Sequence, residues 1–293
     1  MIARAWKAPN FRVVARDLDG KRLTPFVTYA DSEEQLRTRL GRMGLSTESL
    51  ERYRFGTWLK KAQKTLDKLK AASGVKERKG ILRTSPHWQE LKRHLFDLFQ
   101  GRCAYCEGKP LVDSSGDVEH YRPKLGVLEE AGHGGYWWLA YSPQNLLPAC
   151  ENCNRVRGKR TSFPVEGGTR AWDDQGLATE QPLLLNPYEE GFDIRQHVTF
   201  IEGRAEGISR RGLRSVATYN LNRPGLGEER RQRQKDTIQS WLVLSQTRGS
   251  FVEGKKVVVE KILNGDRPYP TAALDALERK IQEEIGAFLG DAA

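Results

Sequence analysis

All four cysteines of the 293-residue chain occur in two C-x-x-C pairs, Cys103 with Cys106 and Cys150 with Cys153. Each short spacing presents two sulfur atoms on the same side of a turn, so the two pairs can surround one tetrahedral Zn²⁺. The alternatives are two disulfides, four buried thiols or a redox-active pair. Nothing else in the sequence indicates an oxidising compartment, and a redox pair needs no second C-x-x-C. The spacing therefore predicts a structural zinc site.

Polar residues that could carry chemistry lie between and beside these pairs. The stretch Asp117–His120 follows a turn rich in Ser and Gly and leaves through a proline, which predicts a short strand. Asn145 begins a loop that leads into the second cysteine pair, and Asn154 is expected to start a basic helix that runs to Arg160. Read in chain order, the region is strand, strand and helix.

This pattern resembles the HNH (ββα-metal) nuclease family, in the version held together by a four-cysteine zinc site. The closer likeness is to the PtuB-like HNH proteins of the Septu and retron anti-phage systems. The matching motifs are Cys103-Ala-Tyr-Cys106-Glu107, Val118-Glu119-His120-Tyr-Arg-Pro-Lys124, Trp138-Leu-Ala-Tyr141, Asn145-Leu-Leu-Pro-Ala-Cys150, Cys153-Asn154 and Phe163-Pro164. Weaker likeness extends upstream to residues 87–92 and downstream to 186–187 and 219–224. The resemblance implies an α+β fold, with a ββα-metal core and a four-cysteine zinc site surrounded by helices.

The resemblance also implies roles for the polar residues. His120 is the expected general base, because imidazole titrates near neutral pH. Four thiolates leave the zinc no open position for water, so a second, hard ion is expected. Glu119 and Asn154 offer the oxygen ligands that suit Mg²⁺ or Mn²⁺, and Asp117 is a weaker candidate. By the family's pattern, Asn145 orients the His120 loop by hydrogen bonding. Many relatives carry Asp in place of Glu119 and His in place of Asn154.

Basic residues that follow Asn154 are expected to line the substrate groove, namely Arg155, Arg157, Lys159 and Arg160. The net charge of +10 also favours a polyanionic partner, although charge alone discriminates poorly. The resemblance implies a hydrolase, a metal-dependent endonuclease of DNA or RNA, tRNA included. It would be the effector of an anti-phage system and would act with an ABC-like ATPase partner of the PtuA type.

A non-catalytic zinc-ribbon module that binds nucleic acid or another protein is the alternative. In that interpretation Glu119 and His120 are an ordinary polar pair, Asn145 is a turn residue and Asn154 caps a helix. The sequence does not distinguish DNA from RNA as the ligand in either interpretation.

The remaining chain is expected to provide three further segments around the core at residues 86–180. Residues 1–45 predict a small ββα unit, with a hairpin over 11–30 that turns at Asp19-Gly20 and a helix to about Met43. Residues 46–85 predict a helix over 47–75 and then a linker. Residues 181–293 predict a mainly helical region, with strands at 183–185 and 198–201 and helices over 210–219, 226–246 and 272–289. A helix over 88–99 is expected to brace the first cysteine pair.

Lysines give the helix over 47–75 a basic face, formed by Lys60, Lys61, Lys64, Lys68 and Lys70. A solvated surface and a phosphate-binding surface both fit this pattern. Hydrophobic residues make up 38% of the chain, no stretch is long enough to span a bilayer, and the start lacks an apolar signal segment. The sequence therefore predicts a cytoplasmic protein without a membrane segment.

Overall fold

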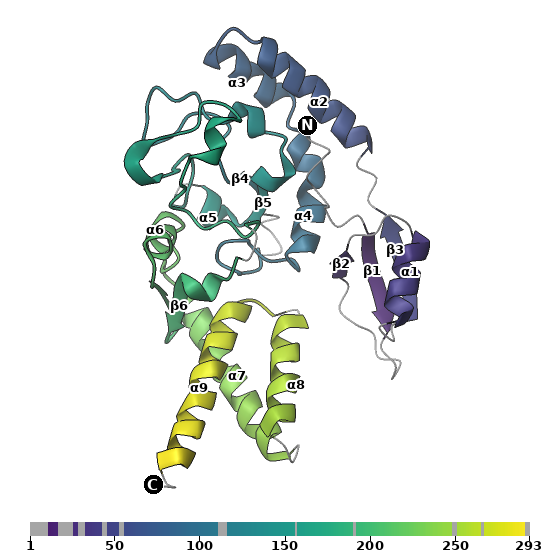
Figure 1. The fold of residues 1–293 in the computed structure, drawn as a ribbon, viewed down its shortest axis with the longest axis vertical. Coiled ribbons are helices and arrows are strands. Elements are labelled where there is room, and N and C mark those ends of the chain that lie inside the picture. The colour runs from purple at the N-terminus through teal and green to yellow at the C-terminus, as the bar shows by residue number, and fades with distance from the viewer. Residues whose placement is uncertain are drawn as a thin grey trace.

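The computed structural model describes residues 11–16, 26–28, 33–42, 46–52, 56–110, 116–155, 157–189, 192–247, 251–264 and 267–290. These residues combine α-helices with small antiparallel sheets (Figure 1). The predicted α+β class is therefore confirmed. The division into four segments remains a prediction.

The N-terminal unit is a sheet with one described helix. Strand β1 (Phe11–Arg16) lies between β2 (Phe26–Thr28) and β3 (Ser46–Arg52), and pairs with both in antiparallel fashion. Helix α1 (Glu33–Arg42) buries Leu36 and Leu40. The predicted helix over 47–75 is thus wrong at its start, because pairing with β1 holds residues 46–52 extended. The predicted Asp19-Gly20 turn lies outside the described residues.

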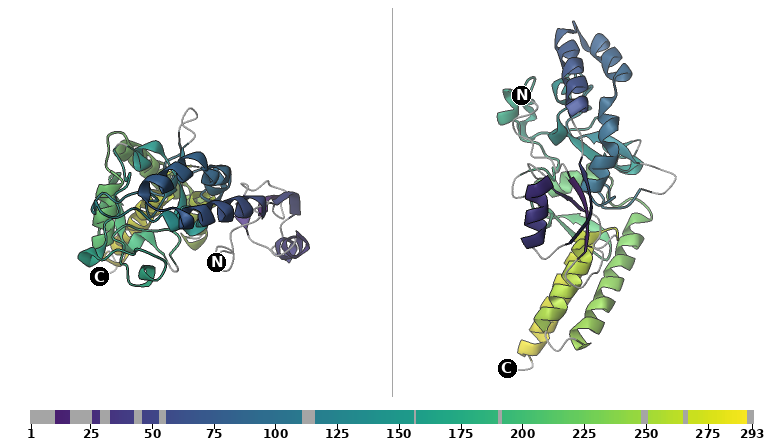
Figure 2. Two further views of the ribbon diagram at one scale, coloured as in Figure 1. Left: turned by 90° about the horizontal axis from the view of Figure 1, so that it is seen from above. Right: turned by 90° about the vertical axis from the view of Figure 1, so that its right-hand side faces the viewer.

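Helices α2 (Gly56–Ala71) and α3 (Val75–Thr84) form a hairpin at one end of the molecule (Figures 1 and 2). The predicted linker over 73–85 is therefore wrong. Leu82 of α3 is buried, and the Arg78 guanidinium donates hydrogen bonds to the carbonyl oxygens of Leu69 and Ala72. These contacts hold α3 against the carboxyl end of α2.

The segment that leads to the first cysteine pair is helical, as predicted. It consists of the 3₁₀ turn η1 (His87–Leu91) and helix α4 (Lys92–Leu98). Trp88, Leu91 and Leu95 are buried in one hydrophobic cluster with Trp58 of α2. The indole of Trp58 also donates to the carbonyl oxygen of His87 at 2.8 Å. This cluster joins the α2–α3 hairpin to the central part of the protein.

The central unit is a strand pair followed by one helical turn. Strand β4 (Asp117–His120) pairs antiparallel with β5 (Leu146–Ala149), and α5 (Glu151–Asn154) follows. The stretch predicted as a loop after Asn145 is therefore a strand, in which every residue is buried.

Asn154 ends helix α5, whereas a helix starting at this residue was predicted. The chain turns back because the backbone amide of Lys159 donates to the carbonyl oxygen of Cys153 at 2.8 Å, and that of Arg160 to the carbonyl oxygen of Asn154 at 2.9 Å. Gly158 permits this close return, since a Cβ atom there would lie 2.1 Å from the Cys153 carbonyl oxygen. A glycine is thus required where the chain passes the end of the helix.

The C-terminal region begins with a hairpin of β6 (Val198–Ile201) and β7 (Arg204–Gly207) and continues into α6 (Arg210–Thr218). Helices α7 (Leu226–Thr247), α8 (Phe251–Asn264) and α9 (Pro270–Gly290) form a bundle at the opposite end from α2–α3 (Figures 1 and 2). Trp241, Val258 and Leu277 are buried in its core. The sequence analysis did not identify α8, and the predicted strand at 183–185 is wrong because these residues are irregular.

Short 3₁₀ turns connect these elements: η2 (Trp137–Leu139), η3 (Pro143–Asn145), η4 (Glu166–Gly168), η5 (Gly176–Ala178) and η6 (Ile194–Gln196). Among the described helices, none combines the length and the apolar composition needed to cross a bilayer.

Candidate metal centre and active site

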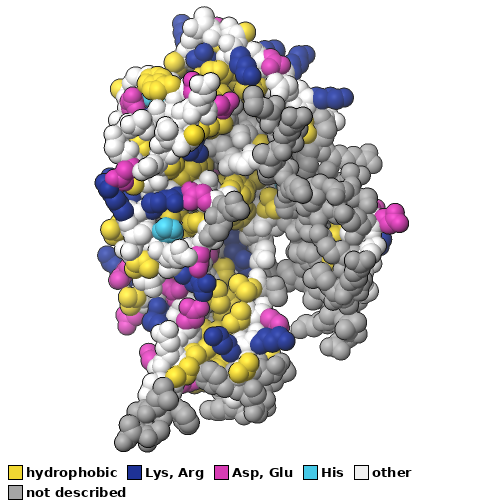
Figure 3. Space-filling model, in the orientation of Figure 1, with side chains coloured by type: hydrophobic (Ala, Val, Ile, Leu, Met, Phe, Trp, Pro, Cys, Tyr) yellow, Lys and Arg dark blue, Asp and Glu magenta, His cyan; other side chains and the backbone are white. Residues whose placement is uncertain are grey.

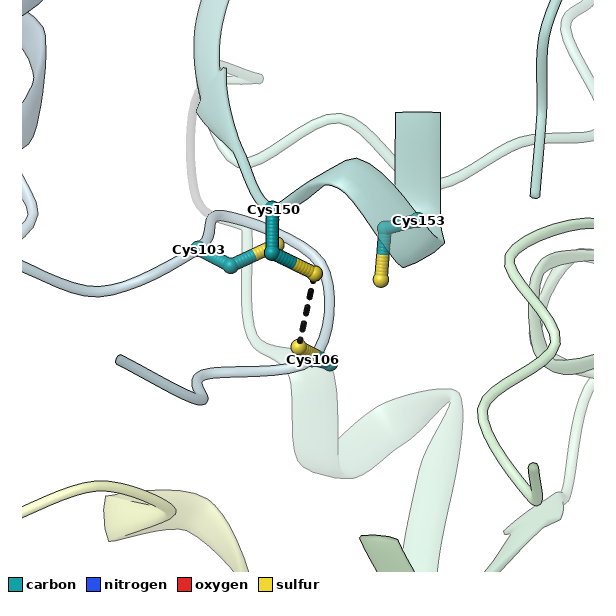
Figure 4. Close-up of side chains that lie close together, drawn as sticks. All are labelled: Cys103, Cys106, Cys150 and Cys153. Carbon is teal, nitrogen blue, oxygen red and sulfur yellow. Dashed lines mark hydrogen bonds between the residues drawn. The ribbon is translucent and has the colours of Figure 1, made fainter. Parts of the chain in front are cut away.

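The four cysteines form a compact cluster. The loop after α4 supplies Cys103 and Cys106, while Cys150 and Cys153 lie at the start of α5 and within it (Figure 4). Their sulfur atoms all lie within 4.8 Å of one another, and those of Cys106 and Cys150 are 3.8 Å apart. Four sulfurs at about 2.3 Å from one tetrahedral Zn²⁺ would be separated by about 3.8 Å, so the cluster fits zinc. The cysteines are free thiols, and 3.8 Å is far beyond a disulfide bond.

Arg223 is a partner of this cluster that the sequence analysis missed. Its guanidinium nitrogens lie 3.4 Å from the sulfur of Cys106, 3.5 Å from that of Cys153 and 3.7 Å from that of Cys150. Zinc with four thiolates is a dianion, so a guanidinium at this distance offsets part of its charge. The only signal in the sequence was the weak likeness over 219–224.

Glu119 of β4 is bound to Lys159. The carboxylate accepts a hydrogen bond from the ammonium of Lys159 at 2.7 Å, and the same ammonium donates to the carbonyl oxygen of His120 at 3.0 Å. The Lys159 side chain is fully buried and that of Glu119 is 7% exposed. Lys159 was predicted to line the substrate groove, but in the structure it is buried and forms an ion pair with Glu119. Arg157 and Arg160 are exposed.

Asp117 shares a second set of contacts with the end of α5. Its carboxylate accepts from the Asn154 amide at 2.9 Å and from Arg155 at 2.8 and 2.9 Å, and Arg155 also lies 3.3 Å from Glu151. Burial raises the pKa of Asp117, but the hydrogen bonds from Arg155 and Asn154 outweigh it and hold that pKa below its ordinary value. Asp117 is therefore the carboxylate that accompanies Asn154.

The two residues predicted to hold Mg²⁺ or Mn²⁺ thus have separate partners, Lys159 for Glu119 and Asp117 for Asn154. In the part of the chain that the structure describes, the cysteines are the one group of three or more thiol, imidazole or carboxylate ligands that converges. The arrangement therefore does not fit a second ion without a change of partners.

His120 is the best-defined polar group of the site. It is 3% exposed, and the edge-to-face ring of Trp88 lies 5.0 Å away. Its Nε2 lies 3.0 Å from the carbonyl oxygen of Ala140, and its Nδ1 lies 3.1 Å from the ammonium of Lys124. A carbonyl only accepts, so the proton is assigned to Nε2 and the lone pair to Nδ1. Burial, together with the charge of Lys124, holds the pKa of His120 well below its ordinary value.

This environment leaves His120 a neutral ring with one tautomer and one accepting nitrogen, as a general base requires, but the lowered pKa makes it a weaker base than a free imidazole. Lys124 is a second functional candidate that the sequence analysis quoted only as part of a motif. Its ammonium also lies 4.7 Å from the centre of the Trp88 ring. The signal was its position four residues after His120, beyond a proline.

Asn145 makes only backbone contacts. Its side-chain oxygen accepts from the amide of Arg122 at 2.7 Å, and its nitrogen donates to the carbonyl oxygens of Arg122 and Leu139 at 3.0 and 3.2 Å. Arg122 follows β4 and Leu139 precedes Ala140, so Asn145 fixes the chain on both sides of the His120 ring. Such contacts orient a loop and leave no oxygen directed at an ion.

Comparison with known proteins identifies one relative. The chain is 39% identical over 158 residues to the Septu protein PtuB of Bacillus mycoides (strain KBAB4). The match covers 50% of this chain and 52% of the relative, so the chain spans about half the length of the curated relative it matches. No protein-family model and no solved structure matches the chain. The resemblance to the PtuB-like group is therefore confirmed, within the half of the chain that the match covers.

Proposed function

We propose that this protein is a metal-dependent HNH endonuclease that hydrolyses phosphodiester bonds of DNA or RNA, tRNA included. Its similarity to PtuB supports a role as the nuclease effector of a Septu-type anti-phage system. The observation that carries the enzymatic part is His120, a neutral imidazole with one accepting nitrogen. The order β4, β5, α5 beside a four-cysteine cluster gives it the surroundings that the HNH resemblance implies.

In this proposal His120 removes a proton from the attacking water. The water must bind at Nδ1, where the ammonium of Lys124 lies 3.1 Å away. Lys124 therefore has to move by about the width of one water molecule, and its charge then lies beside the place where a scissile phosphate would bind. Asn145 keeps the ring in position by holding Arg122 and Leu139.

Zinc would be held by Cys103, Cys106, Cys150 and Cys153, and its role is structural because four thiolates complete a tetrahedron. Mg²⁺ or Mn²⁺, held by Glu119 and Asn154, would neutralise charge at the phosphate. Glu119 would have to release Lys159 to bind such an ion, whereas the hydrogen bond of Asn154 to Asp117 uses only its amide nitrogen.

A partner is part of the same proposal. The resemblance implies an ABC-like ATPase of the PtuA type, which would regulate the nuclease in the cytoplasm. Nucleic acid is the substrate in this scheme.

The second candidate is a non-catalytic module that binds nucleic acid or another protein. It is favoured by the ion pairs of Glu119 with Lys159 and of Asp117 with Arg155, because these groups are satisfied internally. The buried Glu119–Lys159 pair is compatible with a purely structural role, because each charge has its partner.

The deciding experiment incubates the 293-residue protein, alone and with the product of its neighbouring gene, with labelled double-stranded DNA, single-stranded DNA and tRNA in Mg²⁺, Mn²⁺ or EDTA. We expect metal-dependent cleavage, and a loss of about 10² or more in rate for His120→Ala with substrate binding retained. His197→Ala is the matched control, because that ring bonds to Ser209 away from the site. Wild-type cleavage by a folded, zinc-loaded His120→Ala protein would refute the mechanism. Binding without cleavage in every condition would favour the module.

A further inference from the structure

The α2–α3 hairpin has a net positive charge out of proportion to its length. Residues 56–84 contain nine basic side chains and two acidic ones, a net charge of +7, whereas the whole chain has a net charge of +10. The hairpin is one end of the molecule, and dark-blue side chains stand out along the upper edge of Figure 3, over α2 and α3. A tenth of the chain thus supplies most of its net charge.

Most of this charge is not neutralised within the protein. Lys61 pairs with Glu90 at 3.0 Å, and Arg78 stacks on Trp137 with 4.2 Å to the ring centre. The other seven basic residues are exposed and form no ion pair with a carboxylate of the described residues: Lys60, Lys64, Lys68, Lys70, Lys76, Lys79 and Arg83. The two acids of the hairpin have other partners, Gln63 for Asp67 and Ser73 for Glu77.

Three of these lysines form a regular row. Lys60, Lys64 and Lys68 are spaced by four residues, so they lie on one helix face about 6 Å apart along the axis. Trp58 and Leu69 are buried on the opposite face of α2. Like charges at this spacing repel one another. A row of cations that faces solvent suits the repeating negative charge of a nucleic-acid backbone.

Helix α2 also lies beside the elements that hold His120. Helix α2 packs against η1 and η2. Trp88 of η1 contacts the His120 ring, and the carbonyl oxygen of Ala140, which directly follows η2, accepts from its Nε2. The row faces away from these contacts, so a strand bound along it would be separated from the buried His120 ring by helix α2. The predicted groove residues offer less free charge, because Arg155 and Lys159 are used in ion pairs.

We propose that the exposed basic face of α2–α3, centred on Lys60, Lys64 and Lys68, binds the sugar–phosphate backbone of a nucleic acid. Binding through this face is independent of sequence and sensitive to salt. The identification of the polyanion as nucleic acid, and not an acidic protein, rests on the proposed function.

The test compares the wild-type chain of 293 residues with the triple variant Lys60→Gln/Lys64→Gln/Lys68→Gln. The matched control changes Lys255, Lys256 and Lys261 to Gln. These lysines of α8 are exposed and lie at the other end of the molecule, and their substitution removes the same amount of charge. Binding to a labelled 30-base-pair duplex, the corresponding single strand and tRNA is measured by fluorescence anisotropy in EDTA, at 50 to 200 mM salt. Thermal unfolding checks that both variants are folded.

For the duplex, loss of three phosphate contacts should reduce the slope of log K against log salt by about 2.7. We expect the row variant to bind at least tenfold more weakly at about 100 mM salt, and the α8 variant to remain within twofold of wild type. Equal losses in both variants, no loss in the row variant, or no binding by wild type would overturn the proposal. Poly-glutamate, measured in the same way, stands for an acidic protein. The proposal would also be overturned if the row variant kept its nucleic-acid binding and lost only its binding to poly-glutamate.

Binding in EDTA separates this proposal from the nuclease mechanism. If the protein binds nucleic acid through the row but never cleaves it, the binding surface is supported and the nuclease mechanism is refuted. A protein that cleaves with binding independent of the row would do the reverse.

Discussion

Helix α5 connects two polar clusters that differ in how their charges are balanced. At its start, four sulfurs converge beside the one guanidinium of Arg223. At its end, the carboxylates of β4 already have cationic partners, Lys159 for Glu119 and Arg155 for Asp117. An ion would complete the first cluster, whereas it must displace existing partners at the second. Metal binding is thus a matter of folding at the cysteines and of rearrangement at β4.

Removal of zinc should have the largest effect. The metal closes the segment between the two cysteine pairs, and structural zinc supplies about 10 kcal/mol or more of folding free energy. Cys150→Ala should therefore unfold the core, which is measured as loss of the near-UV circular dichroism signal. If wild-type protein purified without chelator were fully folded and contained no zinc, the cysteine cluster would not need a metal to fold, which would contradict this prediction.

The buried pair of β4 should come next. Lys159→Met leaves the Glu119 carboxylate buried without its cation, which should lower the free energy of unfolding by about 3–5 kcal/mol. Glu119→Gln in the same protein should recover most of that loss, because the uncompensated charge is gone. Urea unfolding measures both variants. If Lys159→Met were as stable as wild type, another positive charge, such as a bound ion, would have to compensate the Glu119 carboxylate.

The guanidinium beside the sulfurs should have a smaller effect. Arg223→Gln should weaken zinc affinity by about 10- to 100-fold, the usual cost of losing a group that contacts metal ligands. Competition with a chromophoric chelator gives the affinity. Arg223→Lys should lie between the two, since it keeps the charge and loses the fork of donors. Arg210→Gln, on an exposed residue that pairs with Glu166, is the control.

Acid should have the mildest effect on stability, and it acts through a histidine outside both clusters. Burial lowers the pKa of His94 in α4 to about 4, against about 6.5 for an unfolded histidine. The unfolded chain therefore binds more protons between these pH values, and stability falls as pH falls through this window. One such histidine gives a slope of about 1.4 kcal/mol per pH unit. His94→Gln should reduce the slope of zinc-saturated protein, measured by urea unfolding from pH 6.5 to 5. An unchanged slope would contradict this.

Much of the fold was predictable where one residue type determines the local structure. The C-x-x-C spacing located the sulfur cluster, and Asp117–His120 is the predicted strand. The failures have tertiary causes. Ser46–Arg52 has residues that favour a helix, but pairing with β1 holds it extended. The charge and Gly80 of α3 resemble a linker, but contacts with α2 hold it helical.

The site shows the same limit at the level of side chains. The sequence placed Glu119, His120 and Asn154 in one region, but it could not indicate their partners. Lys159 reaches Glu119 because Gly158 brings the chain back past the end of α5. Arg223 reaches the sulfurs from 70 residues beyond Cys153. Such contacts depend on how distant segments pack, which periodicity and spacing do not encode.

Glu107, directly after the first cysteine pair, also holds the C-terminal bundle. Its carboxylate accepts from the backbone amide of Thr271 at 3.0 Å, at the start of α9. Asp275, one turn later, accepts from the amide of Phe200 at 2.7 Å, so the base of α9 is fixed at two points. The helix has 21 residues and extends about 30 Å from this joint. The bundle is in effect a lever, and a small rotation of the cysteine loop would become a displacement of several ångströms at its tip.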